Sequence, residues 1–163
     1  MTGPARRRSP LAALACLLAL APAITLVPAS ARAQGMPQQP ARQVTVFGVL
    51  ATPGQGQDDP KLKEVLPQLK SLLPGHSFKL VKVASKRVVA GESVACDLGG
   101  GFAASSQLIN PADDNGKVQL RFDFRVGGFP QYQTIVSTPP NQVFYANRML
   151  DDGRRLIVGI GAR

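Results

Sequence analysis

The residues of this chain best suited to catalysis are one histidine and three adjacent pairs of aspartates. The histidine is His76, and the pairs are Asp58-Asp59, Asp113-Asp114 and Asp151-Asp152. Two carboxyl groups that flank a bond can hydrolyse a glycoside, and a histidine beside a serine can activate it for acyl transfer. Each aspartate pair falls in a predicted loop or turn, where aspartate is favoured for its hydrogen bonds alone. The chain has no Gly-x-Ser-x-Gly elbow. We therefore keep a small secreted hydrolase that uses these loop Asp and His residues as the alternative, and favour a protein without catalytic activity.

Metal and phosphate sites have weaker support still. One histidine and one cysteine after the leader cannot supply the usual zinc ligand sets. Asp113, Asp114 and Asn115 offer oxygens to a calcium ion, but their loop is too short and lacks a closing glutamate, so it predicts a turn. The run Gly99–Gly101 lacks the lysine and the following helix of a phosphate-binding loop, and it also predicts a turn. We predict no catalytic residue, no metal site and no cofactor.

Cys96 is the only cysteine after the leader, so it cannot form an internal disulfide. It shares one face of a predicted strand with Val94 and Leu98, opposite Ser93 and Asp97. This alternation predicts a buried thiol that behaves as a small apolar side chain. An intermolecular disulfide and a reactive thiol are the other interpretations.

The clearest structural pattern runs from Lys117 to Arg125. Apolar residues alternate strictly with polar ones, which predicts a strand with one buried face and one solvated face. The apolar set is Val118, Leu120, Phe122 and Phe124, and the polar set is Lys117, Gln119, Arg121, Asp123 and Arg125. The three cations lie four residues apart, or roughly 14 Å at the usual strand rise. We take Lys117, Arg121 and Arg125, joined by Arg154 and Arg155 from the last turn, as the candidate binding residues. The alternative is that such cations only keep a sheet face soluble.

The rest of the chain supplies the elements around this strand. From Phe102 to Ala162, apolar runs separated by Gly, Pro, Asn or Asp predict five antiparallel strands joined by four turns. In Val44–Leu50 both alternating sets are largely apolar, which predicts a strand covered on both faces. Gly159 and Gly161 share one face of the last strand and allow a bulky side chain or a backbone to approach closely.

An amphipathic helix is predicted from Pro60 to Leu73, with Asp59 as its cap and an apolar stripe of leucines and Val65. Pro67 interrupts it, so we expect a kink or a break into two short pieces. Ser77–Val83 and Lys86–Ala90 are read as two further strands. Together these elements predict a mainly β (α+β) fold: an antiparallel sheet or two-layer β-sandwich with one amphipathic helix packed on it.

The N-terminus has the pattern of a secretory signal peptide. Arg6–Arg8 forms a charged region, Leu11–Ala21 an apolar run, and Ala31–Ala33 a small-x-small cleavage motif. A membrane anchor is the alternative, but Pro22 and Pro28 interrupt the apolar stretch. We therefore divide the chain into a signal peptide (1–33), a Gln- and Pro-rich disordered tether (34–41) and a single β-rich domain (42–163).

The net charge of the chain limits the kind of partner that it could bind. The whole chain carries 19 Lys and Arg against 10 Asp and Glu, a formal charge of +9. Four of the arginines lie in the leader, which leaves 15 cations against 10 anions, or +5, after cleavage. These cations are scattered, and the chain has no tryptophan and two tyrosines, so the stacking platforms of a nucleic-acid binder are missing. A mildly basic surface favours an acidic protein or an anionic envelope polymer.

The sequence therefore predicts an exported, non-catalytic β-rich binding or structural module, secreted or periplasmic in a bacterial-type cell, that docks a protein or anionic polymer partner. No stable membrane span is expected after signal cleavage, and the oligomeric state is left open.

The first testable prediction concerns export. Cleavage after Ala33 should give a mature protein that begins at Gln34. Intact-mass analysis of the exported product measures this directly. A product that retains residues 1–33 would mean that the N-terminus is a membrane anchor.

Overall fold

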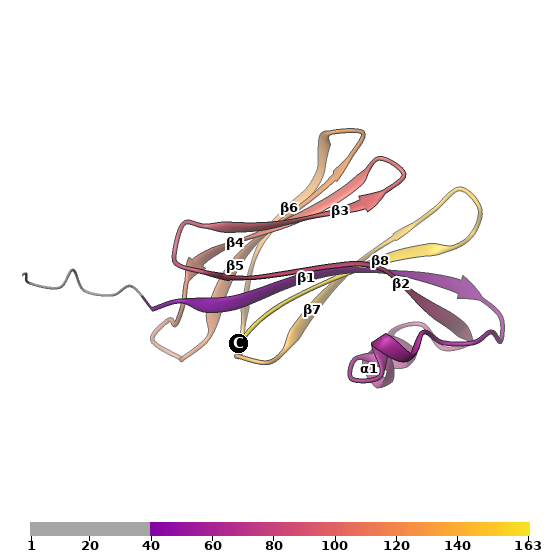
Figure 1. Cartoon of the computed structure of the whole chain (residues 1–163), viewed down its shortest axis with the longest axis horizontal. Coiled ribbons are helices and arrows are strands. Elements are labelled where there is room, and N and C mark those ends of the chain that lie inside the picture. The colour runs from indigo at the N-terminus through magenta and orange to yellow at the C-terminus, as the bar shows by residue number, and fades with distance from the viewer. Residues whose placement is uncertain (1–39) are drawn as a thin grey trace, which may run out of the picture. The chain divides into compact units, whose positions relative to one another are not determined.

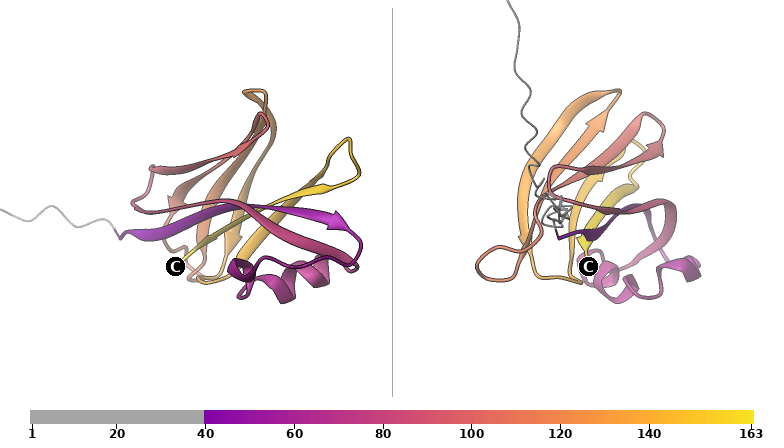
Figure 2. Two further views of the ribbon diagram at one scale, coloured as in Figure 1. Left: turned by 45° about the vertical axis from the view of Figure 1, so that its right-hand side comes forward. Right: turned by 60° about the vertical axis from the view of Figure 1, so that its left-hand side comes forward.

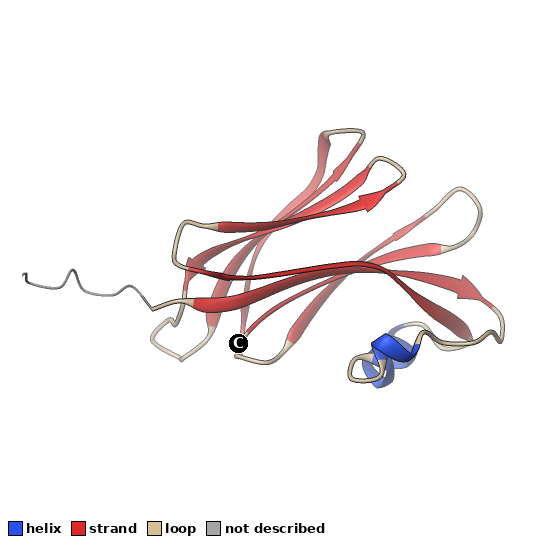
Figure 3. Cartoon of the chain, in the orientation of Figure 1, coloured by secondary structure: helices blue, strands red, loops and turns tan. Residues whose placement is uncertain are grey.

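The computed structural model describes residues 40–163; the predicted signal peptide and residues 34–39 of the predicted tether lie outside the described residues. Within the described residues, eight strands form two four-stranded antiparallel sheets, accompanied by a short helical segment (Figure 1; Figure 3). Sheet A has the strand order β2-β1-β8-β7, and sheet B has the order β3-β4-β5-β6. The predicted mainly β fold with antiparallel sheets and one helix is confirmed. The elements are β1 (Arg42–Pro53), η1 (Pro60–Leu62), α1 (Leu66–Leu72), β2 (His76–Val88), β3 (Ser93–Gly99), β4 (Phe102–Asn110), β5 (Val118–Val126), β6 (Phe129–Thr138), β7 (Val143–Met149) and β8 (Arg155–Ala162).

The main core lies between the two sheets and is built from alternate residues of their strands. Sheet B contributes the apolar set of β5, whose side chains are all buried as predicted. Sheet A contributes alternate residues of β1 and β8, such as Val46 and Ile160, which are both fully buried. Ser106 of β4 also lies in this core, and its hydroxyl is a buried side-chain polar atom without a hydrogen-bond partner among the described residues. An unpaired buried hydroxyl costs on the order of 1–3 kcal/mol.

A second, smaller core covers the opposite face of sheet A. Phe47, Val49 and Ala51 of β1 are buried there against Leu62 of η1 and Leu69 of α1. The prediction that the first strand is covered on both faces is therefore confirmed. This cover explains why an antiparallel strand lacks the polar face that sheets usually show to water.

The helical segment is broken into two pieces, as predicted, but Pro67 lies at the start of α1 rather than in the middle of a longer helix. Proline is accepted in the first turn of a helix, because an amide hydrogen at that position would have no acceptor within the helix. Asp59 caps η1 as expected, since its side chain accepts a hydrogen bond from the Lys61 amide. Tyr145 of β7 holds α1 against the sheet by donating a hydrogen bond to Gln68 Oε1 over 2.7 Å.

Gly159 permits the closest contact in the second core. It pairs with Phe47 across β1 and β8, and the tip of the Phe47 ring occupies the space that a Cβ atom at position 159 would need. The ring also meets Tyr145 edge-on, with centroids 6.3 Å apart. This confirms the prediction that a bulky side chain approaches the glycine face of the last strand.

Two predictions about connectivity are wrong. The stretches Ser77–Val83 and Lys86–Ala90 are not two strands, because β2 continues through Ser85 and pairs with β1 along its whole length. The turn at Pro139 and Pro140 does not join a pair of neighbouring strands, since it carries the chain from β6 in sheet B to β7 in sheet A. Alternation specifies which residues are buried, and it does not specify which sheet a strand joins.

Both links between the sheets lie at one end of the sandwich. The β2–β3 turn follows Val88, which pairs with Arg42, and the β6–β7 link reaches Asn141, whose amide donates to the Ala162 carbonyl. Both points are beside the start of β1, because Val44 pairs with Ala162. At the other end the β5–β6 and β7–β8 turns lie on strands that diverge (Figure 2). The two layers are thus held together at one end and spread apart at the other.

The Phe47–Gly159 contact yields the second prediction. Gly159→Ala should lower the free energy of unfolding by about 1–3 kcal/mol, because the new methyl group forces the Phe47 ring out of place. Urea unfolding of Phe47→Leu, of Gly159→Ala and of the double variant Phe47→Leu/Gly159→Ala measures the coupling free energy between the two positions. The double variant should lose less than the sum of the single losses, since leucine leaves room for the methyl group. Additive losses would contradict this account.

Candidate binding site

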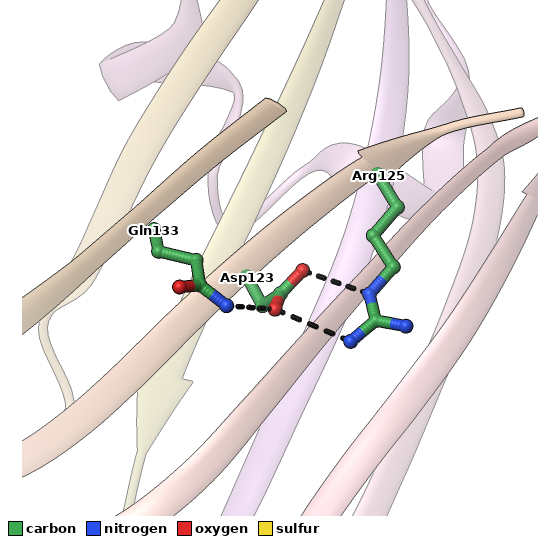
Figure 4. Close-up of polar contacts among 3 residues, drawn as sticks. All are labelled: Asp123, Arg125 and Gln133. Atoms are coloured by element: carbon green, nitrogen blue, oxygen red, sulfur yellow. Dashed lines mark hydrogen bonds and ion pairs between the residues drawn. The ribbon is translucent and has the colours of Figure 1, made fainter. Parts of the chain in front are cut away.

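The polar face of β5 contains a buried carboxylate. Asp123 is 7% exposed, and both of its oxygens accept hydrogen bonds (Figure 4). Arg125 Nε donates to Oδ1 over 3.0 Å, and Gln133 Nε2 donates to Oδ2 over 2.5 Å. Burial by itself raises the pKa of the Asp123 carboxyl, but the hydrogen bonds from Arg125 and Gln133 and the charge of Arg125 outweigh it. The pKa of Asp123 therefore lies below its ordinary value.

This arrangement changes the predicted basic row. Arg125 forms an ion pair with Asp123, so its charge is largely neutralised on the sheet face. Lys117 lies just before β5, in the β4–β5 turn, where its amide donates to Asp113 Oδ1. Arg121 is exposed in the middle of β5 and lies in register between Gln107 of β4 and Ile135 of β6. Within residues 40–163, Lys117 and Arg121 form no ion pair, so the row presents two free cations rather than three.

The two arginines of the last turn do not join this row. Arg155 begins β8, and Arg154 precedes it in the β7–β8 turn of sheet A, whereas β5 is in sheet B. Arg154 is also engaged locally, since its Nε donates to Asp152 Oδ2 over 2.7 Å. The candidate binding residues therefore fall on two sheets.

A different feature of sheet B had no part in the predicted site. Strand β6 is one of the two edges of this sheet, and its ten residues include no charged side chain. Two of its large apolar side chains, Phe129 and Ile135, are 73% and 58% exposed. By contrast β2, an edge of sheet A, carries Lys79, Lys82, Lys86 and Arg87. Lysine and arginine on an edge discourage pairing with other chains, so β2 is protected by charge and β6 is not. The missing charge was visible in the sequence, but the edge position of this segment was not.

The aspartate pairs of the hydrolase alternative have structural contacts. Asp58 forms an ion pair with Lys70 and accepts from the Phe78 amide, and Asp59 caps η1. The hydrogen bond from Lys70 is the main reason that the pKa of Asp58 is lowered. Asp113 accepts hydrogen bonds from two amides of the β4–β5 turn, and Asp152 supports the β7–β8 turn in the same way. His76 begins β2, and its Nδ1 lies 3.1 Å from the Pro74 carbonyl.

Cys96 is 2% exposed in the core between the sheets, beside Val94 and Leu98 as predicted. Burial raises the pKa of its thiol, so the reactive thiolate is disfavoured. Gly100 and Gly101 form the turn between β3 and β4, directly after Gly99 at the end of β3, and all three glycines have positive φ. In the part of the chain that the structure describes, no group of three His, Cys, Asp or Glu residues could hold a metal ion.

Comparison with known proteins adds no relationship: no family model, no curated protein and no solved structure matches this chain. Among residues 40–163, no helix has the length and apolar character needed to cross a bilayer.

The Asp123 contacts yield the third prediction. Asp123→Asn should lower the free energy of unfolding at pH 7 by about 1 kcal/mol, because it removes the charged acceptor of three hydrogen bonds. A carboxyl whose pKa is lowered by folding stabilises the protein above its unfolded pKa of about 3.9. That contribution is lost as the pH falls through the folded-state pKa.

Urea unfolding at pH 7, 4 and 3 measures the difference between the wild type and Asp123→Asn. The difference should shrink at the lower pH values. Asp114→Asn, an exposed change in the β4–β5 turn, is the matched control. A difference that stays constant with pH would mean that the ionised carboxylate does not contribute to stability.

Proposed function

We propose that this protein is an exported, non-catalytic binding module that docks an extended segment of a partner protein by adding it as a strand beside β6. The observation that carries the proposal is the uncharged, exposed edge of sheet B. An added strand gains backbone hydrogen bonds from such an edge, and alternate side chains give the specificity. Only Pro130, near the start of β6, lacks an amide hydrogen for this pairing.

The charge beside this edge favours an acidic partner. Arg121 lies one strand in from the edge, in register with Ile135, and forms no ion pair among residues 40–163. A carboxylate on the outer face of the added strand would stand about two strand spacings, roughly 10 Å, from the Arg121 backbone. The long arginine side chain can span much of that distance. The proposal therefore keeps Arg121 as a binding residue and assigns Arg125 to the contact with Asp123.

Export and the envelope location rest on the N-terminal sequence pattern alone. The hydrolase alternative is the weaker proposal, because the aspartates it needs already cap η1 or support turns. An anionic polymer is also less favoured than a protein, since the three-cation row that would track it is reduced by the Asp123–Arg125 ion pair.

The fourth prediction tests the edge. The double variant Ile135→Lys/Ser137→Lys adds two charges to the outer face of β6, where both residues are exposed. Ser93→Lys/Ala95→Lys adds the same charges to exposed positions of β3, the opposite edge of the same sheet. Each protein is expressed from its full-length gene with a C-terminal tag and cross-linked in its native cells.

The β6 variant should retain its fold and lose roughly tenfold of its cross-linked partner, a loss of about 1.4 kcal/mol. The β3 variant should capture the partner at the wild-type level, and Arg121→Gln should weaken capture and make it less sensitive to salt. Equal capture by both lysine variants, or an equal loss in both, would show that the β6 edge is not the docking surface.

A further inference from the structure

A cleft of about 340 Å³ opens between the inner faces of the two sheets, on the side where β6 and β7 are the edge strands. Its volume is within the usual range for small-ligand sites. Most of the lining is apolar and comes from the core-facing sides of the strands. The lining side chains that face the core are Phe124, Tyr132, Phe144, Ala146, Leu156 and Val158.

The cleft follows from the way the sheets are joined. Both links between the sheets lie at the other end of the sandwich, and the layers diverge toward the β5–β6 and β7–β8 turns (Figure 2). At the base of the opening, Phe122 meets Tyr132 and Phe144 edge-on, with ring centroids 6.1 and 6.3 Å away. Phe124, Leu156 and Val158 are each at most 6% exposed, so this part of the wall is made of packed core residues. The cleft is therefore a preformed feature of the fold.

One cation stands over this apolar surface. Arg148 lines the cleft, and it pairs with Leu156, whose side chain is buried between the sheets. Because paired residues of neighbouring strands project to the same face, the Arg148 side chain projects between the sheets. Arg148 forms no ion pair within residues 40–163. The nearby Arg154 is neutralised by Asp152, so the two arginines differ in their need for an anion.

We propose that the cleft binds an unbranched monocarboxylate, with its apolar tail between Phe124 and Phe144 and its carboxylate on Arg148. A single guanidinium matches a single carboxylate, with two parallel hydrogen bonds. The apolar walls favour a tail without polar groups, since an amide would lose its hydrogen bonds to water there. This ligand site goes beyond the proposed docking edge. β6 contributes Gln131 and Tyr132 to the cleft, but the carboxylate contact is on Arg148 of sheet A, and the titration that tests the site needs no docked strand.

Calorimetric titration of the exported protein with butanoate, octanoate and dodecanoate, each below its micelle concentration, tests the proposal. Affinity should rise with chain length, by up to about fourfold per buried methylene. Dodecyltrimethylammonium, which has the same tail and the opposite charge, should bind more weakly than dodecanoate. Absence of dodecanoate binding, or affinity that does not change with chain length, would overturn the proposal.

The role of Arg148 is tested with Arg148→Gln and the matched control Arg87→Gln, an exposed change on the opposite edge of sheet A. Arg148→Gln should weaken dodecanoate binding roughly tenfold and remove the preference over the cationic detergent. Arg87→Gln should behave as the wild type. Methyl NMR should show shifts in Ala146, Leu156 and Val158 on dodecanoate binding. Shifts elsewhere, or an equal loss in both variants, would refute the cleft as the site.

Discussion

The fold depends on covering both faces of the two central strands of sheet A. β1 and β8 bury one set of side chains against sheet B and the other set under η1 and α1. Apolar area contributes about 25 cal/mol per Å² when it is removed from water, so leaving either face open would forfeit much of the stability. The helical segment is therefore part of the core. Glycine at position 159 lets the Phe47 side chain of β1 pack directly on the backbone of β8, because a Cβ atom there would overlap the ring.

The outer face of sheet A is covered by η1 and α1, whereas the outer face of sheet B is exposed. No helix of residues 40–163 packs there, so β5 keeps a solvated face. β6 is an open edge because no further strand of these residues pairs with it. The covalent links between the sheets explain the cleft. With both crossings at one end, no covalent link within residues 40–163 holds the layers together at the other end, where they diverge (Figure 2). The edge and the cleft thus arise from the same topology.

The sequence predicted the local patterns well and the topology poorly. Alternation identified the buried set of β5, the double cover of β1 and the burial of Cys96, because each depends on residues two apart in one strand. The division of the strands between two sheets depends on pairing across the whole chain. The chain around Pro139 and Pro140 has the same turn residues whether it joins two neighbouring strands or two sheets, so the sequence did not distinguish them. The break near Pro67 was predicted, but its place at the start of α1 follows from packing of Leu62 and Leu69 on sheet A.

The same limit explains why the sequence did not show that the candidate binding residues lie on two different sheets. Charged residues attract notice in a sequence, yet the fold pairs Arg125 with Asp123 and Arg154 with Asp152. Pairing of this kind stabilises strands and turns and leaves little charge for a partner. Within residues 40–163, two surfaces of another kind stay open: a strand edge without charge, and an apolar cleft beside Arg148, which forms no ion pair in this part of the chain. The edge is open because no strand of the described residues pairs with its outer side, and the cleft is open because none of their side chains fills it. Neither can be recognised before the order of the strands is known. In this two-sheet fold, a search for a binding surface is therefore better guided by the edges and openings that the strand order leaves uncovered than by the clusters of charge in the sequence.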